Sequence, residues 1–254
     1  DIGVGAREVG YLFGQYKRIM GTFEGGTITG KGIPFGGSLA RTQATGYGLC
    51  YFAEEAMRCM KNDGFAGKTV VVSGSGNVAT YAAEKCTQLG GKVVAMCDSN
   101  GYVYDPNGID LAKLIDIKQR RRARIKVYAD EELDLEGAMA LSAIGCKGVF
   151  EGANMPLTPD AIAAVQGAGL MYSPGKASDA GGVATSGLEM TQNSMRLSWS
   201  FEEVDEKLQG IMKNIFHAAY DASVEVGKPG DLMVGANVAG FLKVAAAMMA
   251  QGVV

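Results

Sequence analysis

The sequence predicts an α/β fold: a mostly parallel sheet with flanking helices, followed by a helical carboxyl-terminal region. Two short apolar runs without polar alternation, at residues 68–74 and 92–97, are typical of strands buried on both faces of a parallel sheet. Segments with helical spacing alternate with such runs, which favours β-α-β connections over antiparallel hairpins. The last third of the chain shows helical periodicity alone.

In the first half of the chain, the spacing of apolar residues predicts helices at 9–18 and 44–61, separated by a glycine-rich irregular segment. The β-branched run at 68–74 predicts the first strand. A helix at 77–89 then ends at a Gly-Gly turn, and residues 92–97 predict the second strand. Together these three elements make one βαβ unit of about 30 residues.

The alternation continues in the second half. Residues 148–152 and 170–173 predict further strands, around a helix that begins near Pro159. The Ser-Phe-Glu-Glu sequence at 200–203 has the form of a capping box, in which the serine hydroxyl and the last carboxylate each accept a backbone N–H. It predicts the start of a long amphipathic helix, and residues 234–249 predict a second one.

The composition indicates a soluble globular protein. The 254 residues include 24 Lys+Arg and 27 Asp+Glu, a net charge of −3, and 47% are hydrophobic, which excludes disordered and collagen-like chains. A protein with a net charge this close to zero lacks the excess of positive charge with which proteins bind nucleic acid. No uninterrupted apolar stretch reaches the ~20 residues of a membrane helix, and the amino terminus lacks a signal-peptide pattern. We expect neither nucleic acid nor membrane as a partner.

The five cysteines have no Cys-x-x-Cys pairing and lie among apolar neighbours. This pattern favours free thiols in a reducing compartment over a disulfide or metal framework. We therefore expect no bound metal and a cytoplasmic location, with an organelle as the alternative.

A glycine-rich loop lies between the first predicted strand and the following helix. Residues 73–79 read Ser-Gly-Ser-Gly-Asn-Val-Ala and hold the Gly-x-Gly-x-x-Ala fingerprint of Rossmann-like domains. Gly74 permits the tight turn, Gly76 lets the backbone reach a diphosphate, and Ala79 lets the helix pack against the strand. The helix N-terminus then faces the phosphates. A tight strand-to-helix turn without a ligand is the alternative. The predicted cofactor contacts in this loop are Gly74, Ser75, Gly76, Asn77 and Val78.

The residue type at the end of the second strand bears on cofactor choice. Asp98 stands where an acid accepts the adenosine ribose hydroxyls, which favours NAD because a carboxylate repels a 2′-phosphate. Ser99 follows it, and Lys118 and Arg121 lie downstream, where they could fold back over the same edge. The residues alone leave NAD and NADP open, and a solvated helix face is the alternative for the two cations.

Seven sequence blocks, in family order and spread over almost the whole chain, resemble the hexameric small-subunit glutamate dehydrogenases of the Glu/Leu/Phe/Val dehydrogenase family. They are DIGVGARE from Asp1, TGKG from Thr29, ATGYG from Ala44, SGSGNVA from Ser73, EGANMP from Glu151, GKASDAGGVATSGLEM from Gly175 and GANVAGF from Gly235. The resemblance implies reversible oxidative deamination of L-glutamate to 2-oxoglutarate and ammonia. It also implies hydride transfer to a nicotinamide cofactor and a homohexameric assembly.

The resemblance further implies roles for matching residues in the catalytic cleft. Asp1 matches the catalytic aspartate, which moves protons between the substrate amine and water. Arg41 and Thr45 match positions that line the substrate and nicotinamide cleft. Ser186 matches the serine that binds the distal carboxylate of glutamate, and Val183 matches the apolar wall beside it. A helix N-cap is the alternative role for this serine.

Other matches concern the cofactor. Asn77 and Asn154 match cofactor contacts, and Asp179 stands where the family usually has a cofactor-facing asparagine. Ser99, Lys118 and Arg121 match positions that hold the 2′-phosphate in members that use NADP, where an acid equivalent to Asp98 is tolerated. The resemblance therefore favours NADP, with NAD as the alternative.

The resemblance also implies domain boundaries in this chain and two departures from the family. It implies an interdomain helix and glycine-rich segment at 1–43, a Rossmann-type domain at 44–187, and a helical region at 188–254 that returns toward the substrate domain. That substrate domain, with the catalytic lysine, precedes Asp1 in the family, so this chain alone is expected to be inert. After Glu131, one or two strands of the cofactor sheet are expected to be missing.

We expect two further residues to have no catalytic role. His217, the sole histidine, is expected to be a solvated surface residue without a catalytic partner. Trp199 precedes the capping box and is expected to form a hydrophobic staple or an interdomain contact. Two other functions stay open: a dinucleotide-binding module without turnover, and a Leu, Phe or Val dehydrogenase, against which Ser186 argues.

Overall fold

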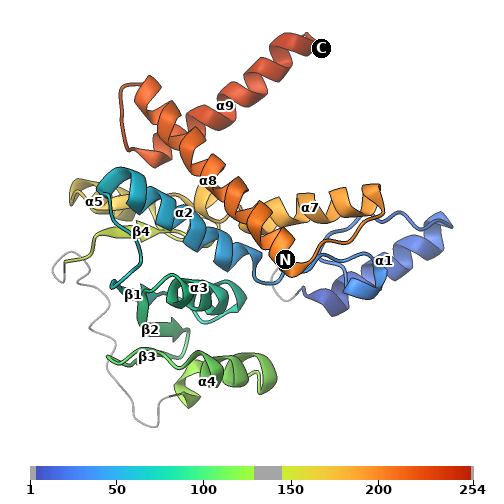
Figure 1. The fold of residues 1–254 in the computed structure, drawn as a ribbon, viewed down its shortest axis with the longest axis horizontal. Helices are drawn as coiled ribbons and strands as arrows, with labels where there is room; N and C mark the ends of the chain where they lie inside the picture. The colour runs from blue at the N-terminus through green and yellow to red at the C-terminus, as the bar shows by residue number, and fades with distance from the viewer. Residues whose placement is uncertain (1–3, 129–144, 253–254) are drawn as a thin grey trace.

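The computed structural model describes residues 4–128 and 145–252. The helices run α1 Ala6–Met20, α2 Ala44–Lys61, α3 Asn77–Gln88, α4 Leu111–Ile115, α5 Pro159–Gly167, α6 Gly175–Ser178, α7 Gly181–Met195, α8 Phe201–Glu225 and α9 Leu232–Gln251, with short turns of helix at Ile33–Phe35, Asp116–Arg120 and Ile125–Val127. The strands are β1 Thr69–Val72, β2 Lys92–Asp98, β3 Gly101–Tyr104, β4 Gly148–Phe150 and β5 Met171–Ser173. The mixed α/β fold that the sequence predicts is confirmed (Figure 1).

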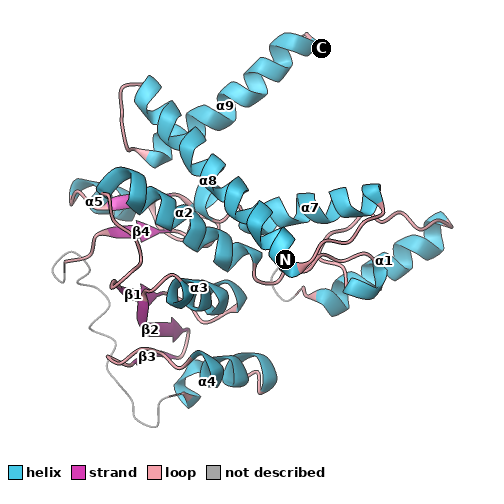
Figure 2. Ribbon diagram, viewed as in Figure 1, coloured by secondary structure: helices cyan, strands magenta, loops and turns pink. Residues whose placement is uncertain are grey.

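The strands form two small sheets. In the first, β1 pairs with β2 in parallel around α3, which confirms the predicted βαβ unit. The third strand, β3, runs antiparallel to β2 and was not predicted. A two-residue turn joins these strands, and Gly101 closes the turn with a positive φ of 147°. In the second sheet, β4 pairs in parallel with β5 (Figure 2).

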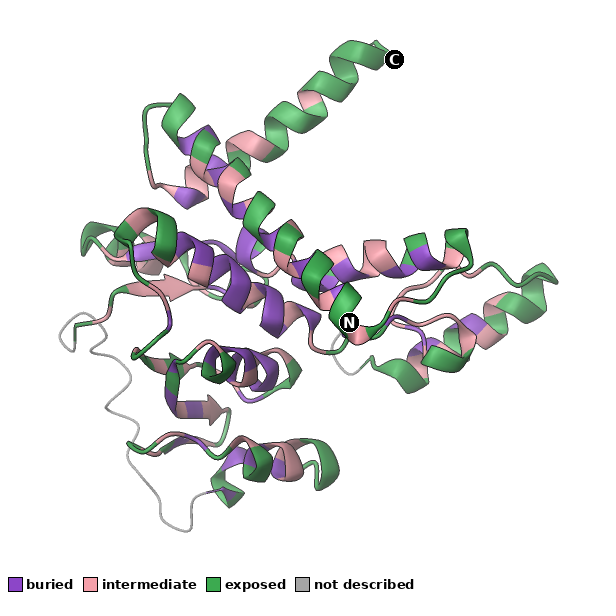
Figure 3. Ribbon diagram, in the orientation of Figure 1, coloured by how far each residue is buried: buried purple, intermediate pink, exposed green. Residues whose placement is uncertain are grey.

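The prediction that the first strand is buried on both faces is wrong. Residues along β1 alternate between exposed and half-buried, and Val71 is 50% exposed. The physical reason is that β1 is an edge strand: within residues 4–128 and 145–252, no strand pairs with its edge away from β2. The prediction for the second strand is confirmed, since Val93, Val94 and Met96 of β2 are buried (Figure 3).

Helix α2 lies between the two hydrophobic clusters of the core. One of its faces packs against α3 and the first sheet, and the other packs against α8. The contact with α3 needs Gly46, because a Cβ there would lie 2.5 Å from the Ala82 backbone nitrogen. On the other face, the Phe52 and Phe216 rings meet edge to face with centroids 5.6 Å apart. This central position holds the amino-terminal end of α2 beside the glycine-rich loop.

Helix α8 begins with the predicted capping box. The Glu203 amide donates to the Ser200 hydroxyl at 3.2 Å, and the Ser200 amide donates to the Glu203 carboxylate at 2.7 Å. These two bonds satisfy backbone donors that the first helical turn leaves without a partner. The box therefore fixes where this 25-residue helix starts.

Replacing Ser200 with alanine is expected to lower the free energy of unfolding by about 0.5–2 kcal/mol, because the Glu203 amide loses the hydroxyl that accepts its hydrogen bond. Urea denaturation followed by circular dichroism measures the loss. Ser198→Ala, at an exposed position in the preceding loop, serves as the control and is expected to change stability by less than about 0.5 kcal/mol. Equal effects of the two changes would contradict a capping role.

Helix α9 extends away from the rest of the molecule (Figure 1). In the part of the chain that the structure describes, it is the one helix long and apolar enough to cross a membrane by length and composition. Core helices of soluble proteins pass the same test. Asn237 and Lys243 are polar residues within its apolar sequence. The expectation that the chain has no membrane partner stays a prediction.

Candidate functional site

The β1–α3 loop has the backbone geometry that the fingerprint predicts. Gly74 has a φ of 121°, a conformation that residues with a side chain rarely adopt. Gly76 is the N-cap of α3 and has an ordinary φ of −76°. A Cβ at Gly76 would meet nothing within 4 Å, so its glycine leaves open space in front of the helix. Among the described residues, no side chain caps the helix N-terminus. Its amide groups are therefore available to an anion.

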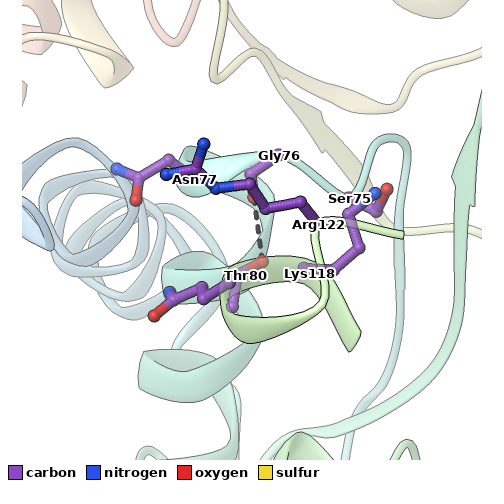
Figure 4. A pocket seen from close by; sticks show the side chains of 7 residues that line it. Ser75, Gly76, Asn77, Thr80, Lys118 and Arg122 are labelled. Carbon is purple, nitrogen blue, oxygen red and sulfur yellow. Dashed lines mark hydrogen bonds between the residues drawn. The ribbon is translucent and has the colours of Figure 1, made fainter. Parts of the chain in front are cut away.

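A hollow of about 340 Å³ lies in front of these amides. Its walls come from the loop, from the first turn of α3 and from the turn that follows α4. The lining residues are Ser75, Gly76, Asn77, Thr80, Lys118, Gln119 and Arg122. Figure 4 shows the Arg122 side chain extending across the hollow toward Gly76 and Asn77. Two cations thus face the positive end of α3, an arrangement suited to a polyphosphate.

The structure places the two neighbouring arginines differently. Arg122 adopts a positive φ of 52° and lines the hollow. Arg121 instead pairs with Asp116 at 2.7 Å, and its side chain is 63% exposed. Of the predicted cation pair, Lys118 lines the hollow and Arg121 does not. Sequence reasoning missed Arg122, because no periodic pattern reveals a left-handed residue at the end of a helix.

The carboxylate of Asp98, at the end of β2, interacts with other groups of the chain. Its carboxylate accepts the backbone amides of Ile125 and Asn100, each at 2.8 Å, and lies 3.6 Å from the Lys118 amine. Burial alone would raise the pKa of Asp98, but the two amides and Lys118 outweigh it and hold the pKa below its usual value. The negative charge that would repel a 2′-phosphate is therefore largely compensated.

Ser99 lies beside this carboxylate. Its hydroxyl accepts a hydrogen bond from the Arg124 guanidinium at 3.2 Å. Arg124 is a second cation that sequence reasoning did not assign to the site. With Lys118 and Arg122, it makes the edge beyond β2 net positive.

The predicted substrate residues meet where α2 and α7 approach each other. The Arg41 guanidinium donates from Nε to the Ser186 hydroxyl at 3.0 Å. A Cβ at Gly182 would lie 2.5 Å from the Thr45 hydroxyl, so this glycine is what permits the close approach. Ser186 lies inside α7, well past its N-cap Ala180. The alternative role of Ser186 as an N-cap is therefore wrong.

The remaining predicted residues are more scattered. Val183 is 77% exposed on α7, and Asn154 is exposed between β4 and α5. The Asp179 carboxyl has a buried oxygen without a hydrogen-bond partner among the described residues. Burial raises the pKa of Asp179. Asp1 lies outside the described residues.

A buried ion pair joins the glycine-rich segment to α7. The Lys31 amine lies 2.6 Å from the Glu189 carboxylate, and both side chains are fully buried. The same carboxylate accepts the backbone amides of Gly30 at 2.9 Å and Lys31 at 3.3 Å. This network fixes the helix that carries Ser186.

The structure also bears on the cysteines, on His217 and on Trp199. The cysteines are free, as predicted. The His217 side chain is 45% exposed, and the structure shows a partner that the sequence did not identify, since its Nε2 lies 2.7 Å from the Glu55 carboxylate. Trp199 stacks under the Lys207 amine at 4.8 Å. Its role as a staple or interdomain contact stays a prediction.

Known proteins resemble this chain over its full length. The Glutamate/Leucine/Phenylalanine/Valine dehydrogenase profile matches residues 36–136 and 129–252. A glutamate dehydrogenase of Bacteroides thetaiotaomicron is 51% identical, and an NADP-specific glutamate dehydrogenase of Escherichia coli is 47% identical. Each alignment covers 100% of this chain and 63% of the relative. A crystal structure of Plasmodium falciparum glutamate dehydrogenase matches with a TM-score of 0.93 at 46% identity, over 100% of this chain and 61% of that one.

The alignments also bear on the expected gap. The Bacteroides alignment runs over 283 positions for 254 residues here, so at least 283 − 254 = 29 positions have no counterpart in this chain. The two segments that match the family profile overlap at residues 129–136, close to the predicted break after Glu131. Residues 129–144 lie outside the described part, so the number of missing strands stays a prediction. The chain spans less than two thirds of the curated relatives that it matches, and it belongs to the Glutamate/Leucine/Phenylalanine/Valine dehydrogenase family.

Proposed function

We propose that this chain is the cofactor-binding part of an NADP-dependent glutamate dehydrogenase. The reaction is the reversible oxidative deamination of L-glutamate to 2-oxoglutarate and ammonia. The observation that carries the proposal is the hollow in front of α3, where open backbone amides face Lys118 and Arg122. Relatives named NADP-specific glutamate dehydrogenases, 46–51% identical, support the same cofactor.

The residues of the hollow fit a dinucleotide. The amides of Gly76, Asn77 and Val78 would hold the diphosphate, because the glycine leaves open space before them. Lys118 and Arg122, with Ser99 beside them, would hold the 2′-phosphate. The nicotinamide, when bound, supplies the hydride acceptor. Asn154 and Asp179 remain proposed contacts for the same cofactor.

The hydrogen-bonded pair of Arg41 and Ser186 suits the distal carboxylate of glutamate. Because Arg41 donates to the Ser186 oxygen, the serine hydrogen is left to donate to another acceptor. A carboxylate is such an acceptor, and the nearby guanidinium attracts its charge. Leucine, phenylalanine and valine lack this group, so the polar pair argues against them as substrates. Val183 and Thr45 would contact the substrate beside this pair.

The proposal includes parts that lie beyond the described residues. Asp1 would move protons between the amine and water, and the catalytic lysine would come from sequence that this chain does not contain. We also propose a cytoplasmic homohexamer and keep the division at 1–43, 44–187 and 188–254. In support of a hexamer, a structure described as a hetero-hexameric glutamate dehydrogenase from Thermus thermophilus matches with a TM-score of 0.87 at 28% identity.

Replacing Arg122 with methionine is expected to weaken NADP binding about 10- to 100-fold, because a charged hydrogen bond is worth about 1.5–3 kcal/mol. NAD affinity is expected to change less than about two-fold, since NAD lacks the 2′-phosphate. Isothermal titration of both cofactors measures the difference.

Arg121→Met is the matched control. Its guanidinium pairs with Asp116 outside the hollow, so NADP affinity is expected to stay within about two-fold of the starting protein. A loss confined to Arg121→Met, or equal losses of NADP and NAD in Arg122→Met, would contradict the assignment of Arg122 to the 2′-phosphate.

Activity separates the proposal from a module without turnover. The full-length protein is expected to reduce NADP in the presence of glutamate and not of leucine. Nucleotide binding without any glutamate-dependent reduction would favour the module instead.

A further inference from the structure

Three side chains that can bind a metal ion meet where α2 and α8 face each other. Glu55 and Cys59 lie one helical turn apart on α2, which places them on the same face. His217 comes from α8. The candidate ligand atoms of the three residues all lie within 4.8 Å of one another. None of these residues lines the hollow in front of α3, so the group is separate from the proposed cofactor site.

We propose that Glu55, Cys59 and His217 bind a divalent cation of borderline softness, with Zn²⁺ as the best match. One thiolate sulfur, one imidazole nitrogen and one carboxylate oxygen form a donor set that zinc accepts, and a water molecule would complete the tetrahedron. On binding, the thiol releases its proton to solvent and its sulfur coordinates the metal.

Two of the three distances between ligand atoms are close to those around such an ion, and the third, between the Cys59 sulfur and the His217 nitrogen, is at most 4.8 Å. With bond lengths of about 2.0–2.3 Å, tetrahedral zinc holds its ligand atoms about 3.3–3.6 Å apart. The Cys59 sulfur already lies 3.5 Å from the Glu55 Oε1. The His217 Nε2 lies 2.7 Å from the same oxygen, so this contact must lengthen by only about 0.6 Å to reach that spacing. The exposed histidine can supply that shift by a small change of rotamer.

The surroundings hold the ligands in place and leave an entry path. Glu55 is 3% exposed, whereas the His217 side chain is 45% exposed and Cys59 is exposed. Phe216, next to His217, packs against Phe52 of α2 with ring centroids 5.6 Å apart. This contact fixes the distance between α2 and α8 next to the candidate ligands. A metal site needs ligands that are held in place by such packing.

One cation of the chain competes for the carboxylate. The Arg58 guanidinium contacts the Glu55 Oε1 through Nη2, and its Nε donates to Oε2 at 3.1 Å. Because the Arg58 side chain is 62% exposed, it can leave Oε1 to the metal without losing solvation. Its charge nevertheless opposes a bound cation. We therefore expect removal of this charge to strengthen metal binding, which is the opposite of what removal of a ligand does.

Metal titration of the full-length protein, purified without a histidine tag, tests the proposal. Co²⁺ is added as a spectroscopic substitute, and Zn²⁺ is measured by competition with a chromophoric chelator. One ion per chain is expected, with a thiolate-to-cobalt charge-transfer band. Cys59→Ser is expected to lose this band and to bind Zn²⁺ at least about 10-fold more weakly, because even outer-sphere changes cost 10–100-fold.

Further variants sharpen the result. His217→Asn is expected to weaken Zn²⁺ binding at least about 10-fold while the charge-transfer band persists at saturating metal. Arg58→Gln is expected to tighten binding. Cys146→Ser removes a half-buried cysteine elsewhere and is expected to leave both readouts unchanged. No charge-transfer band, or equal Zn²⁺ affinity in Cys59→Ser and Cys146→Ser, would overturn the proposal. NADP titration is independent of this outcome.

Discussion

Replacement of Gly76 with valine is expected to abolish NADP binding while the fold stays intact. The backbone at Gly76 has an ordinary φ, and a Cβ there meets nothing within 4 Å, so the protein itself tolerates the side chain. The isopropyl group would occupy the space before the helix amides and keep the diphosphate away. Loss of two charged hydrogen bonds of about 1.5–3 kcal/mol each weakens binding about 10²- to 10⁴-fold.

Isothermal titration measures the affinity, and thermal unfolding checks the fold. Gly210→Val is the matched control, because Gly210 is exposed on α8 and a Cβ there also meets nothing within 4 Å. It is expected to bind NADP like the starting protein. Unchanged NADP affinity in Gly76→Val would refute the assignment of this loop.

Replacement of Lys31 with methionine is expected to have the largest effect on stability. It leaves the carboxylate of Glu189 buried without its cation, and breaking a buried pair in this way costs about 3–5 kcal/mol. That is a large share of the 5–15 kcal/mol that stabilises an ordinary domain. The free energy of unfolding from urea denaturation measures the loss.

The double variant Lys31→Met with Glu189→Gln isolates the charge. The amide oxygen can still accept one of the two backbone amides, which donate to different oxygens of the carboxylate, and no buried charge remains. Much of the lost stability is expected to return. Arg7→Met, which breaks an exposed pair with Glu8, is the control and is expected to cost less than about 1 kcal/mol. A Lys31→Met protein as stable as this control would show that the buried pair does not hold the segment.

Local signals in the sequence predicted much of the fold. The predicted helix at 44–61 has those bounds in the structure, and the predicted helix at 77–89 runs Asn77–Gln88. Apolar spacing, a Gly-Gly turn and the capping box at Ser200 are short-range features, so one sequence suffices to detect them. The burial of β1 was predicted wrongly because exposure of a strand depends on whether another strand covers its edge, which local sequence does not encode.

The site was predicted in part for the same reason. The loop residues of the hollow follow from the fingerprint, whereas Arg122 enters it through a left-handed backbone that no spacing rule identifies. Contacts between distant segments were also missed. The Glu55–His217 pair joins two helices 162 residues apart, and the engagement of Asp98 by the Ile125 amide depends on how the chain returns after α4.

A crystal structure with NADP bound tests the central claim most directly. The account predicts the diphosphate within hydrogen-bond distance of the Gly76, Asn77 and Val78 amides, with the 2′-phosphate beside Lys118 and Arg122. A nucleotide bound elsewhere on the chain, or a diphosphate that does not contact the first turn of α3, would contradict it.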